Sequence, residues 1–197
     1  MKKYIYPAFV LNLFFTVLLG ILYPGVLDFI GNLFFHNRAS GSVILDDTGR
    51  IIGSEFIGQI WNSEKYFWGR PSASNYDAMN SGGTNYSPID TRTLGKITEA
   101  KKRFQNQSGI PEELLLSSGS GLDPHILFNS AIFQMPRIVG ACEGKINEEE
   151  LRKLIIRNSE GKDFGILGQE RVNVLKLNIA LDKQCQVKGS GNVDGHK

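Results

Sequence analysis

An apolar stretch near the N-terminus is the strongest feature in the pattern of hydrophobic and polar positions. No charged residue occurs in residues 4–27, and residues 5–22 are nearly all apolar. In a helix that rises about 1.5 Å per residue, about 20 such residues cross a hydrocarbon core of about 30 Å. The stretch ends at Pro24 without an Ala-x-Ala cleavage site, which favours an uncleaved anchor over a secretory signal peptide. We therefore predict a transmembrane anchor and interfacial segment at residues 1–35.

The segment that follows the predicted span, residues 26–35, is still very apolar. It lies either at the outer interface or against a partner subunit, or else the helix simply continues past the lipid. Lys2 and Lys3 precede the span, and positive charge beside a span stays on the cytoplasmic side. This predicts a single-pass protein with a cytoplasmic N-terminus and the remaining chain outside the cell membrane.

Three residues inside the span share one face of the helix. Asn12, Thr16 and Gly20 recur every four residues. A lone Asn in hydrocarbon is costly unless its amide finds a partner, and small residues let helices approach closely. We interpret this face as a contact with a partner helix. The alternative is that a helix that merely anchors tolerates one Asn.

Beyond the anchor, the pattern is typical of one mixed domain, which we place at residues 36–185. Residues 42–45 and 50–52 flank Asp46-Asp-Thr-Gly49, which predicts a β-hairpin. Residues 59–93 have no helical period but many aromatic side chains, which predicts a long ordered loop.

The remaining elements are mostly helical, and cap signals mark where they begin. The expected elements are a helix over residues 90–105, a short helix from Pro111, a helix from Asp123-Pro124 through Phe133, a helix after the capping box Asn147-Glu-Glu-Glu150, a short strand at 172–174 and a helix over 175–181. Residues 186–197 are small and polar, and we expect a flexible tail. The fold class is therefore α+β: a single N-terminal transmembrane helix followed by one mixed helix and hairpin domain outside the membrane.

Composition changes this picture little. The chain has 197 residues, of which 41% are hydrophobic and 21% charged, so one packed domain with a short appendage fits. A net charge of +2 without a basic stripe argues against nucleic acid as a partner. An exported domain could join Cys142 to Cys185, but nothing in the sequence brings the two within bonding geometry, so no disulfide is predicted.

A search for catalytic chemistry gives no convincing constellation. His36, His125 and His196 lack metal-ligand spacing, so no metal site is expected. Residues 140–145 resemble a phosphate loop but are one residue short, and Ile146 follows where Ser or Thr would bind magnesium. A membrane-anchored extracytoplasmic enzyme remains an alternative, with Asp123 and His125 as an acid/base pair that lacks a nucleophile. A solute-binding module is a third reading.

Two further features concern loops. Ser117-Ser-Gly-Ser-Gly121 presents backbone amides that suit an anion. Gly/Ser segments of this kind commonly form a turn without any binding role. Arg70 stands among the aromatics of the long loop, where we interpret it as an ion-pair partner or carbonyl clamp that orders the loop.

Three stretches, in order and spacing, resemble the C chain of the potassium-transporting Kdp P-type ATPase (the KdpC family). The first runs from Gly53-Ser-Glu-Phe-Ile-Gly-Gln59 through Tyr66-Phe67 and Gly69-Arg70-Pro-Ser-Ala73 to Ser81-Gly-Gly-Thr-Asn85; the second is Ser118-Gly-Ser-Gly-Leu-Asp-Pro-His-Ile126 with Gln134 and Arg137; the third is Val172-Asn-Val-Leu-Lys-Leu-Asn-Ile-Ala-Leu-Asp182. With the anchor, they cover the chain to about residue 183. Three departures stand at Thr84, Leu127 and Ala141-Cys142, where family members usually have Ser, Ser and Ala-Arg.

The resemblance implies a subunit rather than a free enzyme. Its partners would be a channel-like potassium-translocating subunit and an ATP-hydrolysing P-type subunit, in a complex that takes up potassium at high affinity. The aromatic loop, with Tyr66, Phe67, Arg70 and Asn85, would dock onto the translocating subunit.

The family's C chain is also described as a catalytic chaperone that raises the ATP affinity of the hydrolysing subunit. The resemblance therefore implies ATP as a possible ligand, with Ser118, Gly119, Ser120, Gly121 and Gln134 as nucleotide-binding residues. A domain outside the membrane would be separated from cytoplasmic ATP, so we expect assembly to be the main role.

Overall fold

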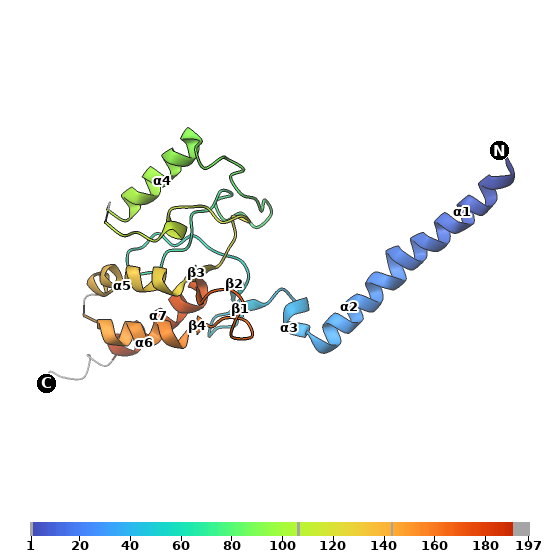
Figure 1. Cartoon of the computed structure of the whole chain (residues 1–197). Helices are drawn as coiled ribbons and strands as arrows, with labels where there is room; N and C mark the ends of the chain where they lie inside the picture. Colours follow the sequence, from blue (N-terminus) through green and yellow to red (C-terminus); the bar gives the residue numbers. More distant parts are fainter. Residues whose placement is uncertain (1, 106, 143, 191–197) are drawn as a thin grey trace. The chain divides into compact units, whose positions relative to one another are not determined.

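The computed structural model describes residues 2–105, 107–142 and 144–190. The chain divides into two compact units, Met1–Ser54 and Glu55–Lys197 (Figure 1). The predicted hairpin thus belongs to the first unit rather than to the domain predicted from residue 36. Most of the predicted tail lies outside the described residues, but its start, through Ser190, belongs to the last helix.

The first unit begins with one continuous run of helix. Helix α1 (Lys2–Val17), a π-helical turn η1 (Leu18–Leu22) and helix α2 (Tyr23–Phe34) follow one another without a break. Residues Lys3–Phe34 are long and apolar enough to cross a membrane, and none of them is buried inside the chain. The helix thus continues through Phe34 without a break.

Pro24 does not break this helix, and the π turn gives the reason. A proline inside a helix has no N–H to donate, and its ring clashes with the carbonyl four residues earlier. The wider turn directly before Pro24 has Tyr23 N–H bonded to Leu18 O, five residues back. A π turn adds one residue to the turn, which gives the ring room.

A short helix, α3 (His36–Ala39), leads to the predicted hairpin of β1 (Val43–Leu45) and β2 (Ile51–Ser54). The strands are antiparallel, with an irregularity between Ile44 and Leu45. Asp46 closes the turn by accepting hydrogen bonds from the backbone N–H of Thr48 and of Arg50 at 2.8 and 2.9 Å. The turn sequence therefore acts as predicted.

The second unit starts with the long loop, which contains no helix or strand from Glu55 to Asp90. Asp90 caps helix α4 (Thr91–Arg103) by accepting from Arg92 N–H. A 3₁₀ turn η2 (Glu112–Leu114) follows, and the capping box of Asn147 and Glu150 begins helix α6 (Glu148–Arg157). These elements match the predicted ones.

A three-stranded antiparallel sheet in the order β3–β5–β4 was only partly foreseen. It contains β3 (His125–Leu127), β4 (Ser159–Glu160) and β5 (Arg171–Asn173). The predicted helix from Asp123-Pro124 was wrong, because residues 125–127 pair with β5 and helix α5 (Phe128–Ala141) starts only afterwards. Asp123 does accept a hydrogen bond from the N–H of His125 at 3.0 Å, as an N-cap would, but pairing across the sheet keeps the chain extended.

The core lies where α5, α6 and the final helix α7 (Val174–Ser190) pack together (Figure 1). Met135 and Ile138 of α5, Leu151 of α6, and Leu177 and Leu181 of α7 are almost fully buried. Phe67 and Trp68 of the long loop belong to the same cluster. One long apolar helix followed by mixed helices and strands confirms the α+β class.

Candidate functional site

The long loop is fastened to the helices by two buried side-chain amides. Asn178 of α7 accepts from Phe67 N–H at 2.9 Å and donates to Phe67 O at 3.0 Å. Gln134 of α5 accepts from Trp68 N–H at 2.9 Å and donates to Trp68 O at 3.0 Å. Both amides are at most 1% exposed. Two consecutive loop residues are therefore held in the same way, one from each helix.

We call Gln134 and Asn178, with Phe67 and Trp68, the amide clamp. An amide side chain carries both a donor and an acceptor, so it satisfies both backbone groups of an extended residue as a neighbouring strand would. An unpaired buried backbone group costs about 1–3 kcal/mol. The clamp thus allows an irregular loop to enter the core without leaving such groups unpaired.

Arginine side chains complete the surroundings of Trp68. The guanidinium carbon of Arg137 lies 3.6 Å from the centroid of its ring, and that of Arg103 lies 4.2 Å from it. Arg137 also donates to Tyr66 O at 3.0 Å and to Gln134 Oε1 at 2.7 Å. Burial, with the positive charge of Arg103, lowers the pKa of Arg137 to about 10. The residue nevertheless stays charged at neutral pH and bridges loop and clamp.

Tyr66 anchors the loop one position before the clamp. Its hydroxyl donates to the carboxylate of Asp182 on α7, with distances of 2.8 and 3.0 Å to the two oxygens. Burial and this carboxylate raise the pKa of Tyr66 above its usual value. The phenol therefore remains a donor to Asp182 well above neutral pH.

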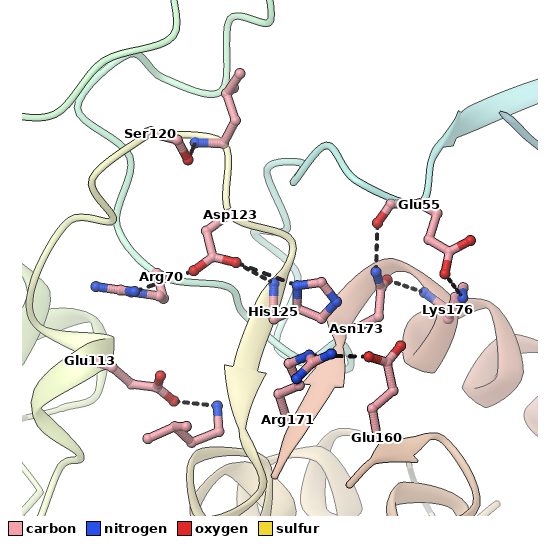
Figure 2. A network of polar contacts seen from close by, with 12 residues as sticks. Glu55, Arg70, Glu113, Ser120, Asp123, His125, Glu160, Arg171, Asn173 and Lys176 are labelled. Atoms are coloured by element: carbon pink, nitrogen blue, oxygen red, sulfur yellow. Dashed lines mark hydrogen bonds and ion pairs between the residues drawn. The ribbon is translucent and has the colours of Figure 1, made fainter. Parts of the chain in front are cut away.

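Arg70 holds a second part of the loop, beside strand β3 (Figure 2). Its guanidinium lies 3.3 Å from Asp123 Oδ2 and donates to Ser117 O at 3.4 Å. The other carboxylate oxygen of Asp123 accepts from His125 N–H. Burial raises the pKa of Asp123, but the hydrogen bonds from His125 and the charge of Arg70 outweigh it, and the pKa is lowered overall.

These contacts of Asp123 are relevant to the alternative in which Asp123 and His125 act as an acid/base pair. Asp123 is already engaged by Arg70 on one side and by His125 on the other, as Figure 2 shows. The cavity beside them is lined by Phe56, Pro124 and residues 118–120 and 122, without a cysteine, lysine or second carboxylate. Ser118 and Ser120 supply the hydroxyl groups among these lining residues, and Ser120 Oγ accepts a hydrogen bond from Leu122 N–H at 3.1 Å.

The segment Ser118–Gly121 packs against the loop rather than standing free. Gly121 has a φ of +70°, and a Cβ there would meet Gly82 O at 2.6 Å. Gly82 N–H donates to Ser120 O at 2.7 Å, and the N–H groups of Ser118 and Gly121 donate to Pro71 O and Ser118 O, each at 3.3 Å. The glycines thus permit close contact of two backbones.

Two of the described cavities contain proposed nucleotide-binding residues. Gln134 borders a cavity of about 420 Å³ together with Arg103 and Arg137. Ser118, Gly119 and Ser120 border a different one, of about 560 Å³, beside Asp123. The nucleotide-binding role of these residues stays a prediction.

The residues predicted to contact partner subunits include Asn85 of the long loop and the helix face of Asn12, Thr16 and Gly20. All of them lie on the surface of the unit that contains them. Asn85 is exposed with a φ of +54°, a left-handed conformation that Asn tolerates. In the long helix, the hydroxyl of Thr16 donates to Asn12 O at 2.8 Å, and nothing lies within 4 Å of a Cβ built on Gly20. Asn12 and Thr16 therefore share a face, and Gly20 lies within the π turn.

Sequence reasoning missed Asn178 and Asp182 as functional positions. The signal for Asn178 was a single amide in an otherwise apolar helical run, but its partner lies 111 residues away. In the described ranges 2–105, 107–142 and 144–190, no three His, Cys, Asp or Glu side chains form a group that could hold a metal ion.

Together these features define a class of protein. They are a helix long and apolar enough to cross a membrane and a domain in which two buried side-chain amides brace a long loop. The sequence matches the family model for the K⁺-transporting ATPase c chain (KdpC) over residues 5–183. The chain therefore belongs to the KdpC family.

Individual relatives agree with the family match. The potassium-transporting ATPase KdpC subunit of Geobacter metallireducens is 42% identical over 183 residues, covering 90% of this chain and 96% of the relative. The KdpC subunit of Caldanaerobacter subterraneus subsp. tengcongensis is 43% identical over 176 residues, covering 86% and 90%. The KdpC subunit of Koribacter versatilis is 40% identical over 187 residues, covering 92% and 95%.

Proposed function

We propose that this chain is an accessory subunit of a high-affinity, ATP-driven potassium uptake complex in the cell membrane, needed for assembly and stability. The observation that carries the proposal is the family match over residues 5–183, which includes both the apolar helix and the domain. Relatives about 40% identical along most of the chain are named as subunits of a potassium-transporting ATPase. A subunit role also agrees with a domain whose buried polar side chains pair with its own loop.

The partners we propose are a channel-like potassium-translocating subunit and an ATP-hydrolysing P-type subunit. The helix Lys3–Phe34 supports membrane partners because none of its residues is buried within the chain. Its side chains are left for lipid and for neighbouring helices. A polar residue such as Asn12 is stabilised in hydrocarbon when a neighbouring helix offers a hydrogen bond.

We place the N-terminus in the cytoplasm and the domain outside. Lys2 and Lys3 stand directly before the span, where positive charge favours the cytoplasmic side. Arg38 follows the helix at its other end, so the asymmetry is modest and rests on the two lysines with the amino terminus.

The aromatic loop from Trp61 to Tyr86 is the surface that we propose docks onto the translocating subunit. It is braced from within by the amide clamp, while Met79 stays 90% exposed. A loop that is already ordered loses little conformational entropy on binding. A large exposed apolar side chain on such a loop is well suited to a protein interface.

Direct ATP binding is the second function that the family resemblance suggests. The amide of Gln134 is occupied by Trp68, and Gln134 and Ser118–Ser120 line different described cavities. An outside domain would also be separated from cytoplasmic ATP. We therefore propose assembly rather than nucleotide binding as the role. Equilibrium dialysis of the full chain in detergent against ATP should show no submillimolar binding; submillimolar affinity would favour the chaperone role instead.

Copurification tests the subunit role itself. An affinity tag at the C-terminus, after Lys197, leaves the helix and the clamp untouched. After gentle detergent extraction, we expect two larger membrane proteins to elute with the tagged chain in constant proportion. Elution of the chain alone from cells that contain both proteins would refute the proposal.

A further inference from the structure

A cavity of about 420 Å³ is bordered by the end of helix α4 and by helix α5, and an arginine from each helix lines it. Arg103 is the last residue of α4, and Arg137 lies on α5. Their guanidinium carbons lie 4.2 and 3.6 Å from the centroid of the Trp68 ring, so the same side chain holds both groups in place. The cavity therefore brings together two positive charges that are far apart in sequence.

The rest of the described lining suits a negatively charged group. The rings of Phe104 and Phe133 supply apolar contacts, and the exposed side chains of Gln105 and Gln107 add amides that can donate hydrogen bonds. Binding sites are commonly built in this way, with apolar walls and a few polar groups that fix the ligand. A carboxylate suits such a lining, because its oxygens accept short, strong hydrogen bonds from guanidinium groups.

The two arginines are not neutralised within the described part of the chain. None of the ion pairs between described residues includes Arg103, Arg137 or Glu64, the carboxylate on the described lining. Arg103 uses one of the five N–H donors of a guanidinium, on Trp61 O, which leaves donors for a ligand. Burial and the charge of Arg103 lower the pKa of Arg137, and the charge of Glu64 opposes them only in part. An anion in the cavity therefore relieves the repulsion between the two arginines.

The cavity adjoins the aromatic loop that we propose as the docking surface. Glu64 of this loop lines the cavity, and Trp61 O and Glu64 O accept hydrogen bonds from Arg103 and Arg137. A partner that lies on the loop therefore comes within reach of the cavity. The positive charge there is complementary to an acidic side chain of that partner, and complementary charges fix the register of an interface.

We propose that this cavity receives an Asp or Glu side chain of the translocating subunit, bound by the guanidinium groups of Arg103 and Arg137. This inference rests on the proposed function, because it requires a partner docked on the aromatic loop. A free carboxylate or phosphate ion would have to bind from dilute solution. A side chain fixed on the docked partner is instead held at the cavity at a high effective concentration, which favours the partner as the source of the anion.

Copurification with charge variants tests the proposal in the complex. Arg103 is the residue to change, because Arg137 also holds the loop and the amide clamp. We expect Arg103→Gln to reduce recovery of the translocating subunit by about tenfold, and Arg103→Lys, which keeps the charge, to retain most of it. A loss that is equally large with Arg103→Lys would assign the effect to the contact with Trp68 instead of to charge, and would overturn the proposal.

Lys102→Gln is the matched control for this charge change. Lys102 is exposed in the same last turn of α4 but is not among the residues that line the cavity. This variant removes the same charge and should recover the translocating subunit like the wild type. Equal recovery with Arg103→Gln and Lys102→Gln would overturn the proposal.

Zero-length crosslinking of the purified complex tests the contact directly. A water-soluble carbodiimide activates a carboxylate, which then forms an amide bond with a lysine amine in contact with it, whereas arginine does not react. In the complex with Arg103→Lys, we expect a crosslinked peptide that joins residue 103 to an Asp or Glu of the translocating subunit. Crosslinks from residue 103 to Glu64 alone, or none from residue 103, would overturn the proposal.

Two further outcomes separate this inference from the proposed function and from a free ligand. If the wild-type chain copurifies with the translocating subunit, the subunit role holds whatever the Arg103 variants do; if it elutes alone, the subunit role and this inference both fail. Calorimetric titration of the full chain in detergent with sodium phosphate should show no submillimolar binding. Submillimolar binding that Arg103→Gln abolishes would assign the cavity to a free oxyanion and overturn the proposal.

Discussion

The side-chain amide of Asn178 pairs with both backbone groups of Phe67, across 111 residues of sequence. Gln134 does the same for Trp68, so the helices α5 and α7 each hold one of two consecutive loop residues. The loop that we propose as a docking surface is thus supported from inside the core. Removal of either amide should first lower the stability of the folded domain.

Gln134→Leu and Asn178→Leu should each destabilise the domain by about 2–4 kcal/mol, because each leaves one buried N–H and one buried C=O without a partner. The measurement is urea unfolding of the full chain in detergent. The only two tryptophans are Trp61 and Trp68, so their fluorescence reports directly on the loop.

Asn129→Leu is the matched control for this pair of variants. Asn129 also lies on α5 but is exposed, so the same kind of replacement should change stability by less than about 0.5 kcal/mol. Equal urea midpoints for Gln134→Leu and Asn129→Leu would show that the amide clamp contributes nothing.

The ion pair of Arg70 and Asp123 predicts a dependence of stability on acid. The folded-state pKa of Asp123 is lowered, so its contribution is complete above the unfolded value near 3.8 and disappears as the pH falls through the folded value. Between about pH 5 and pH 2, wild-type protein should therefore lose more stability than Asp123→Asn. The measurement is the urea midpoint at each pH.

Glu149→Gln serves as the control for charge alone, since this carboxylate on α6 is 77% exposed and pairs only with Lys153 at the surface. It should keep the steep acid dependence of the wild type. An Asp123→Asn profile that runs parallel to that of the wild type would rule out a stabilising role for the Asp123 charge.

The face with Asn12 and Thr16 predicts a defect in association rather than in membrane insertion. The double variant Asn12→Leu/Thr16→Leu removes its polar groups but leaves the span apolar. We expect the chain to remain in the membrane fraction, while recovery of partner proteins falls by about tenfold, equivalent to about 1.4 kcal/mol.

Phe14→Leu is the control in the span, because residue 14 points away from residues 12 and 16 in a helix with 3.6 residues per turn. This variant should copurify with partners like the wild type. Undiminished partner recovery with the Asn12→Leu/Thr16→Leu chain would mean that this face only meets lipid.

Docking through the long loop predicts that Met79→Asp weakens the complex. Met79 is 90% exposed, so a charge there costs little in the isolated chain but is desolvated in an interface. Deletion of residues 72–85 is a poorer test, because it removes the hydroxyl of Ser72 that holds Gly121 O at 2.6 Å. The measurement is the yield of partner proteins with each variant at equal chain levels.

Ile166→Asp is the matched change on another loop, where the side chain is 78% exposed. We expect full partner recovery with Ile166→Asp and reduced recovery with Met79→Asp. The reverse result would move the docking surface to the loop around residue 166.

Local signals in the sequence were sufficient for the elements that depend on neighbours along the chain. The apolar span, the turn at Asp46, the cap at Asp90 and the capping box of Asn147 and Glu150 all involve contacts within a few residues. These are the contacts that a sequence pattern specifies directly.

The remaining features depend on contacts over long distances in sequence. Asp123 makes the local hydrogen bond of an N-cap, yet residues 125–127 form a strand because β5 pairs with them. Asn178 looks like a lone polar residue in an apolar helix until the fold places Phe67 beside it. No local pattern specifies such pairs.

The most direct test of the subunit role is potassium uptake at low external potassium. It compares cells that produce the translocating and hydrolysing subunits with this chain and without it, at equal amounts of both partners. We predict that high-affinity uptake is lost without the chain and restored when the full chain is supplied. Undiminished uptake in its absence would contradict the proposal that this chain is a required subunit of the complex.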